Sequence, residues 1–440
     1  MSITFVEFPV SRRGGIILTV VTAFAPLEKK SALVPPGILA ALVAIAAPLT
    51  LMRELATGSG VGLAHGWEHM AIARSLAAGR GFSNPFAFPT GPTAVLAPLH
   101  PLLLAAIIRV FGDGPAATVP MLLMEAAIHI ACLVLLVRIS AVVFSGTFPA
   151  WMPGLLGAIA VVVCSRPLPQ WESGMAALMA EVFFLCLLRQ GSGAIGAGLA
   201  AGLAWLVSPS LISLVLPAAI FLRGGRYAAK ITVIGLFVTS PWLIRNALTF
   251  HAPVFLRDGF GLELFISNND LAGPRQQDAP ERYQLLHPNN NAVVAAELAQ
   301  RGEPRYFSGL QTQALAWIRS HPRRFLELTA GRIRLWWAGT RAVAILSAFG
   351  IAGLWIRRRE PFARAAASGL FFFSLPYCVI QFDPRYAYPA LWLLALFAGY
   401  AVSRLLALAT ARSRWRTASH RRLPREFTTP PTRSIHGKNQ

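Results

Sequence analysis

Long apolar blocks separated by short polar connections dominate this chain. Examples are Leu33–Met52, Ala117–Val137, Gly193–Leu222, Lys230–Trp242 and Pro389–Ala409. A run of about 18 to 20 apolar residues is long enough to cross a bilayer as a helix. Charged side chains make up only 13% of the chain, whereas about 25% is usual in soluble domains. The blocks therefore predict an all-α polytopic membrane protein and exclude a single soluble domain.

Hydropathy predicts about ten to twelve transmembrane helices between residues 33 and 409. Besides the blocks above, spans are expected at Leu96–Phe111, Ala150–Cys164, Gly174–Leu188, Ala342–Ile356, Ala365–Ile380 and Tyr388–Leu406. Lys29 and Lys30 precede the first span, and positive charge is typical of cytoplasmic span ends. This orientation places both termini inside and the loops 53–95, 251–340 and 381–387 outside. Hydropathy does not fix the number of spans between residues 138 and 222.

Both ends of the chain are expected to lie outside the transmembrane domain at 33–409. Residues 1–32 are interpreted as a cytoplasmic N-terminal extension. Residues 410–440 carry eight Lys and Arg against Glu426 alone, a local charge of +7 out of a net +21. A polar, Pro-containing segment of this kind cannot bury a core, so we expect a disordered cytoplasmic tail. Its charge favours binding to anionic membrane lipid over binding to nucleic acid.

Both longer outer loops are expected to contain amphipathic helices. In the loop 53–95, apolar residues recur at helical spacing over Trp67–Ala78, and Gly79 stands where a helix would end. We expect this helix to lie at the membrane surface. The loop 251–340 holds eight of the 19 acidic residues. Its second half predicts two amphipathic helices divided at His321-Pro322, since Pro suits a first helical turn.

Carboxylates are scarce outside the long loop, which makes Glu68 a candidate for chemistry. It opens the amphipathic helix, where the exposed N–H groups and the helix dipole favour a negative charge without any function. A partly desolvated carboxylate at the membrane surface can instead act as a general base or bind a metal.

The same segment matches a zinc-peptidase pattern. His65-Gly66-Trp67-Glu68-His69 spells H-x-x-E-H, in which two His four residues apart on a helix would share one face. Gly66 is a poor helix former, and no helix-borne third carboxylate is evident. A membrane zinc peptidase therefore stays an alternative, not the leading hypothesis.

Three arginines are expected on the outer side: Arg245, Arg257 and Arg385. The guanidinium group suits bidentate contact with phosphate oxygens. Arg245 and Arg385 end apolar spans, where snorkelling to the interface is the usual explanation. A lipid-linked phosphate lies in the same headgroup layer, so both are candidates to neutralise it, with Tyr386 beside Arg385.

Four groups of motifs follow one another in the chain. They are Glu68–Phe86 with Thr90–Ala94, Pro98–Ala105 and Phe111-Gly112; Pro241–Asn246 with Arg257–Glu263 and Asn268-Asn269; Gly302-Glu303, Tyr306, Trp317-Ile318, His321-Pro322, Arg332-Ile333 and Trp336; and Asp383–Tyr386 before Pro389. Over residues 66–390 this ordered set resembles bacterial membrane glycosyltransferases of superfamily C, which are related to protein O-mannosyltransferases and lipid A aminoarabinose transferases.

The resemblance implies an enzyme of the bacterial cytoplasmic (inner) membrane with its active site outside. Such enzymes transfer sugar from a polyprenyl-phosphate sugar, usually with inversion. An acidic residue of the first outer loop, here Glu68 with His65 or His69 assisting, activates the acceptor, and basic groups or a divalent cation stabilise the departing phosphate. Many relatives carry an Asp or Asp-Glu pair where this chain has His65-Gly66, and more often Tyr where it has His100.

Further candidates for substrate binding are Asn246, Glu263, Asn268 and Asn269. Helix-end and turn roles explain the three Asn equally well, and solvation in the loop explains Glu263. The leading hypothesis is a lipid-linked-sugar glycosyltransferase. The alternative from another class is a transporter or flippase of lipid-linked saccharides, for which broken helices with midplane polar groups are expected and only the break near Pro209 offers a hint.

Overall fold

The computed structural model describes residues 34–57, 67–146, 149–164, 171–189, 193–278 and 285–421. Within these ranges the secondary structure is helical, apart from two isolated β-bridges and irregular connections. The prediction of an all-α protein is therefore confirmed. Residues 1–33, 58–66 and 422–440 lie outside the described ranges, and with them the N-terminal extension, His65 and most of the basic tail.

Four described helices are long and apolar enough to cross a membrane: α6 (Pro115–Val143), α11 (Gly225–Phe250), α18 (Pro361–Val379) and α19 (Pro384–Arg421). Helices α16 (Pro322–Ala338) and α17 (Arg341–Ile356) together pass the same test but are bent by 80°. The other apolar helices of the bundle have shorter apolar stretches: α2 (Pro36–Thr57, apolar over Pro36–Thr50), α7 (Met152–Cys164), α8 (Ser173–Leu188), α9 (Ala194–Val207), η2 (Pro209–Leu211) and α10 (Ile212–Arg223). The described structure is thus that of a helical membrane protein, while the number of spans stays a prediction.

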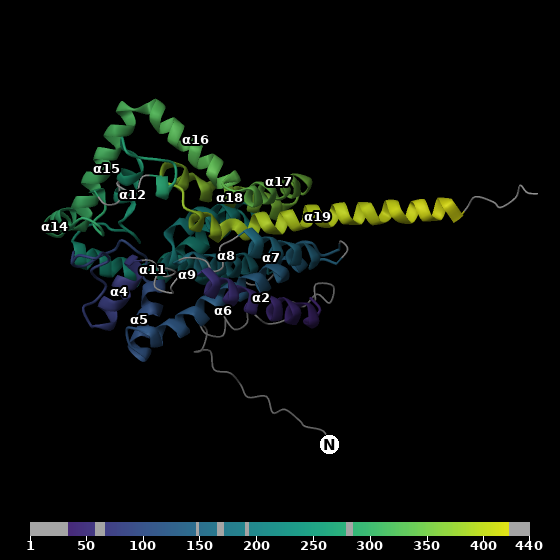
Figure 1. The fold of residues 1–440 in the computed structure, drawn as a ribbon, viewed down its shortest axis with the longest axis horizontal. Coiled ribbons are helices and arrows are strands. Elements are labelled where there is room, and N and C mark those ends of the chain that lie inside the picture. Colours follow the sequence, from purple (N-terminus) through teal and green to yellow (C-terminus); the bar gives the residue numbers. More distant parts are fainter. Residues whose placement is uncertain are drawn as a thin grey trace, which may run out of the picture.

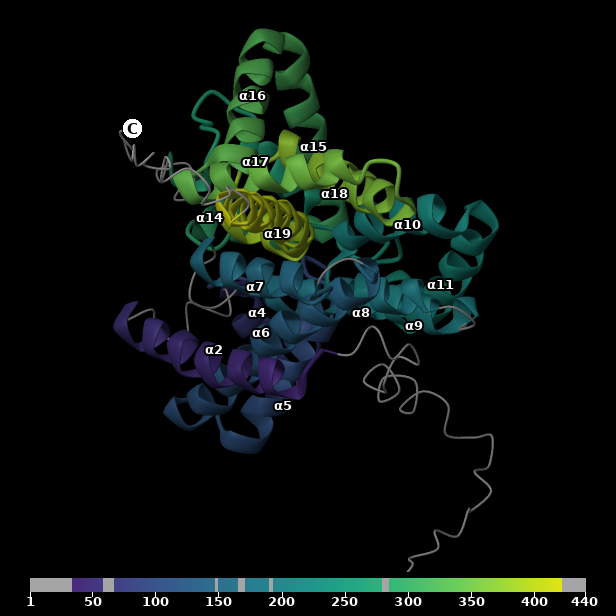
Figure 2. The ribbon, with the colours of Figure 1, turned by 90° about the vertical axis from the view of Figure 1, so that its right-hand side faces the viewer.

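Glycines let the central helices of the bundle pack closely. Gly399 of α19 lies against the backbone of Pro153 in α7, and Gly353 of α17 lies against Phe397 of α19, with no room for a Cβ at either glycine. Small residues at such contacts allow close backbone approach where lipid removes the hydrophobic drive between helices. Helix α19 therefore lies between α7 and α17 (Figure 2), and its C-terminal part projects away from the bundle (Figure 1).

The described part of the loop 53–95, which hydropathy predicts to lie outside and which we call the first outer loop for that reason, forms one corner with the beginning of the bundle. Helix α4 (Trp67–Ala77) confirms the predicted amphipathic helix, and its Met70 and Ala73 are buried against α5 (Leu99–Phe111) and α6. The span predicted at Leu96–Phe111 is instead α5, which has 13 residues and ends at Gly112. At 1.5 Å per residue this helix is about 20 Å long, short of the roughly 30 Å hydrocarbon core.

The long loop folds into a second layer above the bundle. It comprises α12 (Phe260–Ser267), η3 (Gln276–Asp278), α14 (Ala292–Arg301), α15 (Glu303–Ser320) and α16. The predicted division at His321-Pro322 is confirmed, since α15 ends and α16 begins there. Phe82 and Phe86 of the first loop share an apolar cluster with Leu262 and Phe307 of the long loop. The two outer loops are therefore packed together at one end of the molecule (Figure 1).

The C-terminal boundary differs from the expectation. Helix α19 extends to Arg421, so residues 410–421 are helical rather than disordered. Its apolar part runs to Ala411. The helix therefore continues past the apolar stretch into the basic sequence, because Ala and Arg, which are frequent there, favour helix formation.

Candidate functional site

A small polar pocket lies where the two outer loops meet the N-terminal end of α19. We call it the outer pocket. It encloses about 30 Å³, room for about one water molecule. Its walls are Glu68, Phe86, Val95, Leu96, Trp171, Arg257, Gly259, Leu262, Glu263, Gln276, His287, Gln381 and Arg385. Glu68, Glu263, Arg257 and Arg385, which the sequence singled out from distant segments, therefore come together here.

Glu68 is the buried carboxylate of the outer pocket. It lies in the first turn of α4 and is only 8% exposed. Its Oε2 atom is buried and has no hydrogen-bond partner in the described part of the chain. Burial raises the pKa of Glu68, although the charges of Arg385 and Arg257 oppose this shift. A carboxylate with a raised pKa and an unused acceptor atom is suited to receive a proton from a bound hydroxyl.

His287 faces Glu68 from the long loop. Its Nε2 lies 3.9 Å from Oε1 of Glu68, and its ring packs edge-to-face on Phe86. The Nδ1 atom accepts the backbone N–H of Asn289. Burial lowers the pKa of His287 to about 4, so the ring is neutral near pH 7 and carries its proton on Nε2. The distance from this nitrogen to the Glu68 carboxylate is longer than a hydrogen bond.

Arg385 supplies a buried positive charge to the pocket. Its guanidinium lies over the ring of Trp171, with Cζ 3.0 Å from the ring centroid. Nη2 donates to the hydroxyl of Tyr386, and Nε has no hydrogen-bond partner among the described residues, with Asp383 3.9 Å away. The side chain is 7% exposed. Because a buried donor without a partner is costly, this geometry favours an anionic ligand beside Arg385.

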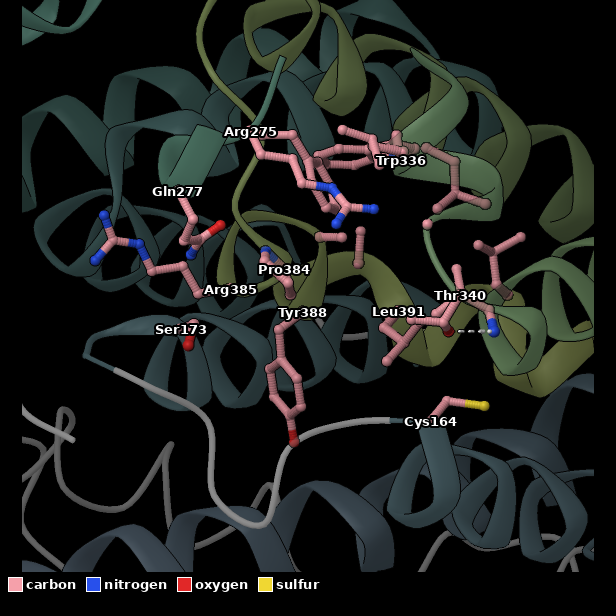
Figure 3. A pocket seen from close by; sticks show the side chains of 18 residues that line it. Cys164, Ser173, Arg275, Gln277, Trp336, Thr340, Pro384, Arg385, Tyr388 and Leu391 are labelled. Carbon is pink, nitrogen blue, oxygen red and sulfur yellow. Dashed lines mark hydrogen bonds between the residues drawn. The ribbon is translucent and has the colours of Figure 1, made fainter. Parts of the chain in front are cut away.

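A much larger apolar cavity adjoins the same arginine. We call it the apolar cavity; its volume is about 470 Å³. Helices α16, α17 and α19 supply most of its walls, including Trp336, Val343 and Leu391. Figure 3 shows the guanidinium of Arg275 reaching over the cavity, whereas the side chain of Arg385 points away from it. Arg385 lines both the outer pocket and the apolar cavity, and so marks where the two adjoin.

Glu172 is a functional candidate that the sequence reasoning missed. It precedes α8, and its Oε2 lies 3.0 Å from Nε2 of His69. Burial disfavours its ionised form, but the contact with His69 and the charges of Arg257 and Arg385 outweigh it and hold the pKa of Glu172 below its usual range. The predicted span at 96–111 placed the segment before α8 on the opposite side of the membrane from the loop 53–95, so Glu172 was not considered together with Glu68. The only available signal was a carboxylate at the start of an apolar helix.

Arg245 is occupied in holding the first outer loop. It donates to the carbonyl oxygens of Phe82 and Thr93, and it lies against the ring of Trp242. It does not line the outer pocket. The expectation that Arg245 binds the donor phosphate therefore finds no support in its position, whereas Arg257 lines the pocket together with Arg385.

The three predicted asparagines hold backbone rather than facing the pocket. Asn246 is fully buried and donates to the carbonyl of Phe255. Asn268 donates to the carbonyls of Leu264 and Val379, and Asn269 donates to those of Phe265 and Ile266. The helix-end and turn roles account for these contacts, and among the predicted substrate-binding residues only Glu263 lines the pocket, where Gln381 donates to it over 3.4 Å.

The described residues contain no group of three or more His, Cys, Asp or Glu side chains arranged to hold a metal ion. Glu68 faces the outer pocket, while the adjacent His69 faces Glu172. His65, the remaining member of the H-x-x-E-H pattern, lies outside the described ranges. The charge-stabilising groups that the described pocket does offer are Arg257 and Arg385.

Comparison of the chain with known protein families, characterised proteins and solved structures finds no match. The function is therefore argued from the residues and geometry of the site.

Proposed function

We propose that this protein is a membrane glycosyltransferase that moves a sugar from a polyprenyl-phosphate donor to an acceptor of the cell envelope. The site would lie at the outer face of the cytoplasmic membrane, and Glu68 would act as the general base. The observation that carries the proposal is the shared position of Arg385. It lies between a pocket with a buried, partly unpartnered carboxylate and an apolar cavity suited to a lipid chain.

The proposed reaction uses the groups of the outer pocket directly. Glu68 takes the proton of the acceptor hydroxyl, and the acceptor oxygen attacks the anomeric carbon. The bond between that carbon and the phosphate oxygen breaks, and its electron pair leaves with the polyprenyl phosphate. Arg385 and Arg257 stabilise the charge that grows on the phosphate, and the neutral ring of His287 lies beside Glu68 in the wall of the pocket. One base suffices, because no covalent enzyme intermediate forms.

The apolar cavity supports a lipid-linked donor over a water-soluble one. Its volume of about 470 Å³ falls in the range of small-molecule sites, which are mostly apolar with a few polar groups that fix orientation. Here Arg275 and Arg385 are the charged groups of the wall. A donor with its first isoprene units in the cavity would present its phosphate to Arg385 and its sugar to Glu68.

The test uses full-length protein in liposomes with radiolabelled polyprenyl-phosphate hexoses and pentoses and an extract of bacterial envelope lipids and glycans. We expect a new labelled glycoconjugate with wild-type protein, formed at least about 10²-fold more slowly with Glu68→Gln. A donor shortened to two isoprene units should have a higher KM, and Leu391→Trp, which fills the cavity, should raise the KM of the long donor more than Leu391→Met does.

Two results would contradict the proposal. Labelled donor that crosses the bilayer without forming product would indicate a transporter of lipid-linked saccharides. Product formed equally well by wild-type protein and Glu68→Gln would remove Glu68 from the mechanism.

A further inference from the structure

One side of helix α16 exposes a row of apolar side chains. Leu326 is 64% exposed and Ile333 is 42% exposed. Ala330 is also exposed, and the partly buried Trp337 continues the row. These positions follow one another at intervals of four, three and four residues, so they lie along one face of the helix. We call Leu326, Ala330, Ile333 and Trp337 the exposed strip.

Arginines border the exposed strip. Arg323 precedes Leu326 by three residues and Arg334 follows Ala330 by four, which makes them neighbours of the strip on the helix surface. The side chain of Arg323 is 95% exposed, and Arg334 is exposed as well. Between residues 319 and 341 the exposed charged side chains are Arg319, Arg323, Arg324, Arg334 and Arg341 against Glu327 alone. The surface around the strip is therefore both apolar and positively charged.

The other side of α16 is packed against the protein. Arg332 is buried and donates to the carbonyl oxygens of Ser267 and Val379. Leu335 and Trp336 are buried too, and they line the apolar cavity. The helix thus has one face fixed to the protein, beside the cavity, and an opposite face that bears the exposed strip.

The position of α16 relative to the bundle places this strip beside lipid. Helices α16 and α17 meet at a bend of 80°. Figure 2 looks nearly along α19, and in this view α15 and α16 extend beyond α17 to one side of the bundle. Helix α19 is long and apolar enough to cross a membrane. A helix that leaves the bundle sideways near the outer end of α19 lies over the bilayer (Figure 1).

We propose that the exposed strip of α16 binds the bilayer surface, with its apolar side chains among the upper acyl chains and Arg323 and Arg334 on the phosphates of anionic phospholipid. Amphipathic helices with arginines beside an apolar face are typical of segments that lie in the membrane interface. Arginine stems can cover apolar surface while the guanidinium stays at the headgroups, and Trp favours the same level. Bound in this way, α16 keeps one wall of the apolar cavity beside the bilayer. The binding does not depend on the proposed transferase activity.

Photocrosslinking tests the contact with lipid and needs no sugar donor. Full-length protein carries benzoylphenylalanine in place of Leu326 or Ile333 and is placed in nanodiscs of phosphatidylethanolamine and phosphatidylglycerol. We expect phospholipid adducts at both positions after illumination. The control is Ser308, an exposed residue in the half of α15 away from α16, where we expect none. A lack of lipid adducts at Leu326 and Ile333, or a covalent protein dimer in their place, would overturn the proposal.

The masses of the adducts at Leu326 test the preference for anionic lipid. The ratio of phosphatidylglycerol to phosphatidylethanolamine adducts should exceed the ratio in the nanodisc. Arg334→Glu should lower it by about fivefold, and so should about 1 M salt, at which charges are screened within about 3 Å. The matched control is Arg305→Glu, since Arg305 is an exposed arginine of α15, and it should leave the ratio unchanged. Residues 410–440 are the same in every variant, so their charge cancels from the comparison. An adduct ratio equal to that of the nanodisc, or an equal fall in both variants, would contradict binding of anionic lipid by α16.

Discussion

Two buried carboxylates of the outer loops, Glu68 and Glu303, differ in how their oxygens are used. Burial raises the pKa of both, that of Glu303 to about 8. Glu303 accepts the hydroxyl of Thr93 at 2.5 Å and the backbone N–H of Ala94 at 2.6 Å. Glu68 instead leaves Oε2 without a partner in the described structure. Burial and a perturbed pKa therefore do not by themselves identify an active-site acid.

The neighbouring arginines repeat the same contrast. Arg245 donates hydrogen bonds to the carbonyl oxygens of Phe82 and Thr93. These residues belong to the same loop that Glu303 binds. Arg385 keeps Nε unpartnered within the described structure and lines both cavities. One acid and one arginine thus clamp the first outer loop, while the other acid and arginine face open space. Unused hydrogen-bonding capacity beside a cavity separates the two pairs, because a buried polar group without a partner is costly unless a ligand completes it.

The sharpest test of this comparison exchanges each acid for its neutral isostere. Glu68→Gln should lower sugar transfer by about 10²- to 10⁴-fold, the usual contribution of a general base, with little change in melting temperature. Glu303→Gln should retain transfer, since its amide can accept from Ala94 and donate to Thr93. Initial rates and melting curves on the same liposome preparations decide the matter. Equal losses of activity in both variants would erase the distinction.

The arginines should follow with a smaller effect. Arg385→Lys keeps the charge but loses the planar fork that matches phosphate, and we expect kcat/KM to fall by about 10²-fold, the order seen when one transition-state donor is removed. Arg245→Lys should leave kcat/KM of the folded protein within about threefold, because its partners are loop carbonyls. If Arg245→Lys proved the more damaging in kcat/KM, the assignment of the two arginines would have to be reversed.

The features that depend on a single short segment could be predicted from the local order of apolar, polar and Pro residues. The helix at α4, the division at His321-Pro322 and the apolar blocks follow from periodicity and from Pro, which act over a few residues. Glu68 and Arg385 were both expected on the outer side, Glu68 in the first turn of a loop helix and Arg385 at the end of an apolar span. These features need no knowledge of how distant segments pack.

The contacts of Glu172, His287 and the asparagines could not be predicted in this way. His69 and Glu172 form a hydrogen bond although they are 103 residues apart in the chain. Helix α5, which was predicted to cross the membrane between them, instead packs against α4. Apolar content alone does not distinguish a span from a short helix buried against its neighbours. The sequence left Asn268 equally open to sugar binding and to a helix-end role, and tertiary packing directs its amide to the carbonyl of Val379. The residue types can be read from the chain, whereas packing determines which donors and acceptors remain available to a ligand.

The clamp around the first outer loop should show itself in stability. Arg245→Ala removes the donors to Phe82 and Thr93 and the contact with Trp242, so we expect a loss of about 2 to 3 kcal/mol. The expected signs are a lower melting temperature and faster proteolysis within residues 82–95. Arg301→Ala, which removes an exposed pair with Glu297 and a contact of the guanidinium with the ring of Tyr306, serves as the control and should change stability by about 1 kcal/mol or less. A loop no more open to protease in Arg245→Ala than in this control would contradict the clamp.

The pH dependence of stability gives the smallest and most specific test of Glu303. Its pKa of about 8 in the folded protein exceeds the ordinary value of 4.5, so the folded state binds the extra proton between these two values. Stability should therefore fall as pH rises towards 8, by up to about 1 kcal/mol between pH 7 and pH 8. Burial raises the pKa of Asp258 to about 6, so this residue lowers stability with rising pH mainly below pH 7. The neutral His69 and His287, with pKa values of about 4, affect stability mainly below pH 6.5. Glu303→Gln should thus flatten the melting temperature between pH 7 and pH 8 relative to wild-type protein, and an unchanged slope would mean that the clamp carboxylate is already ionised in the folded state.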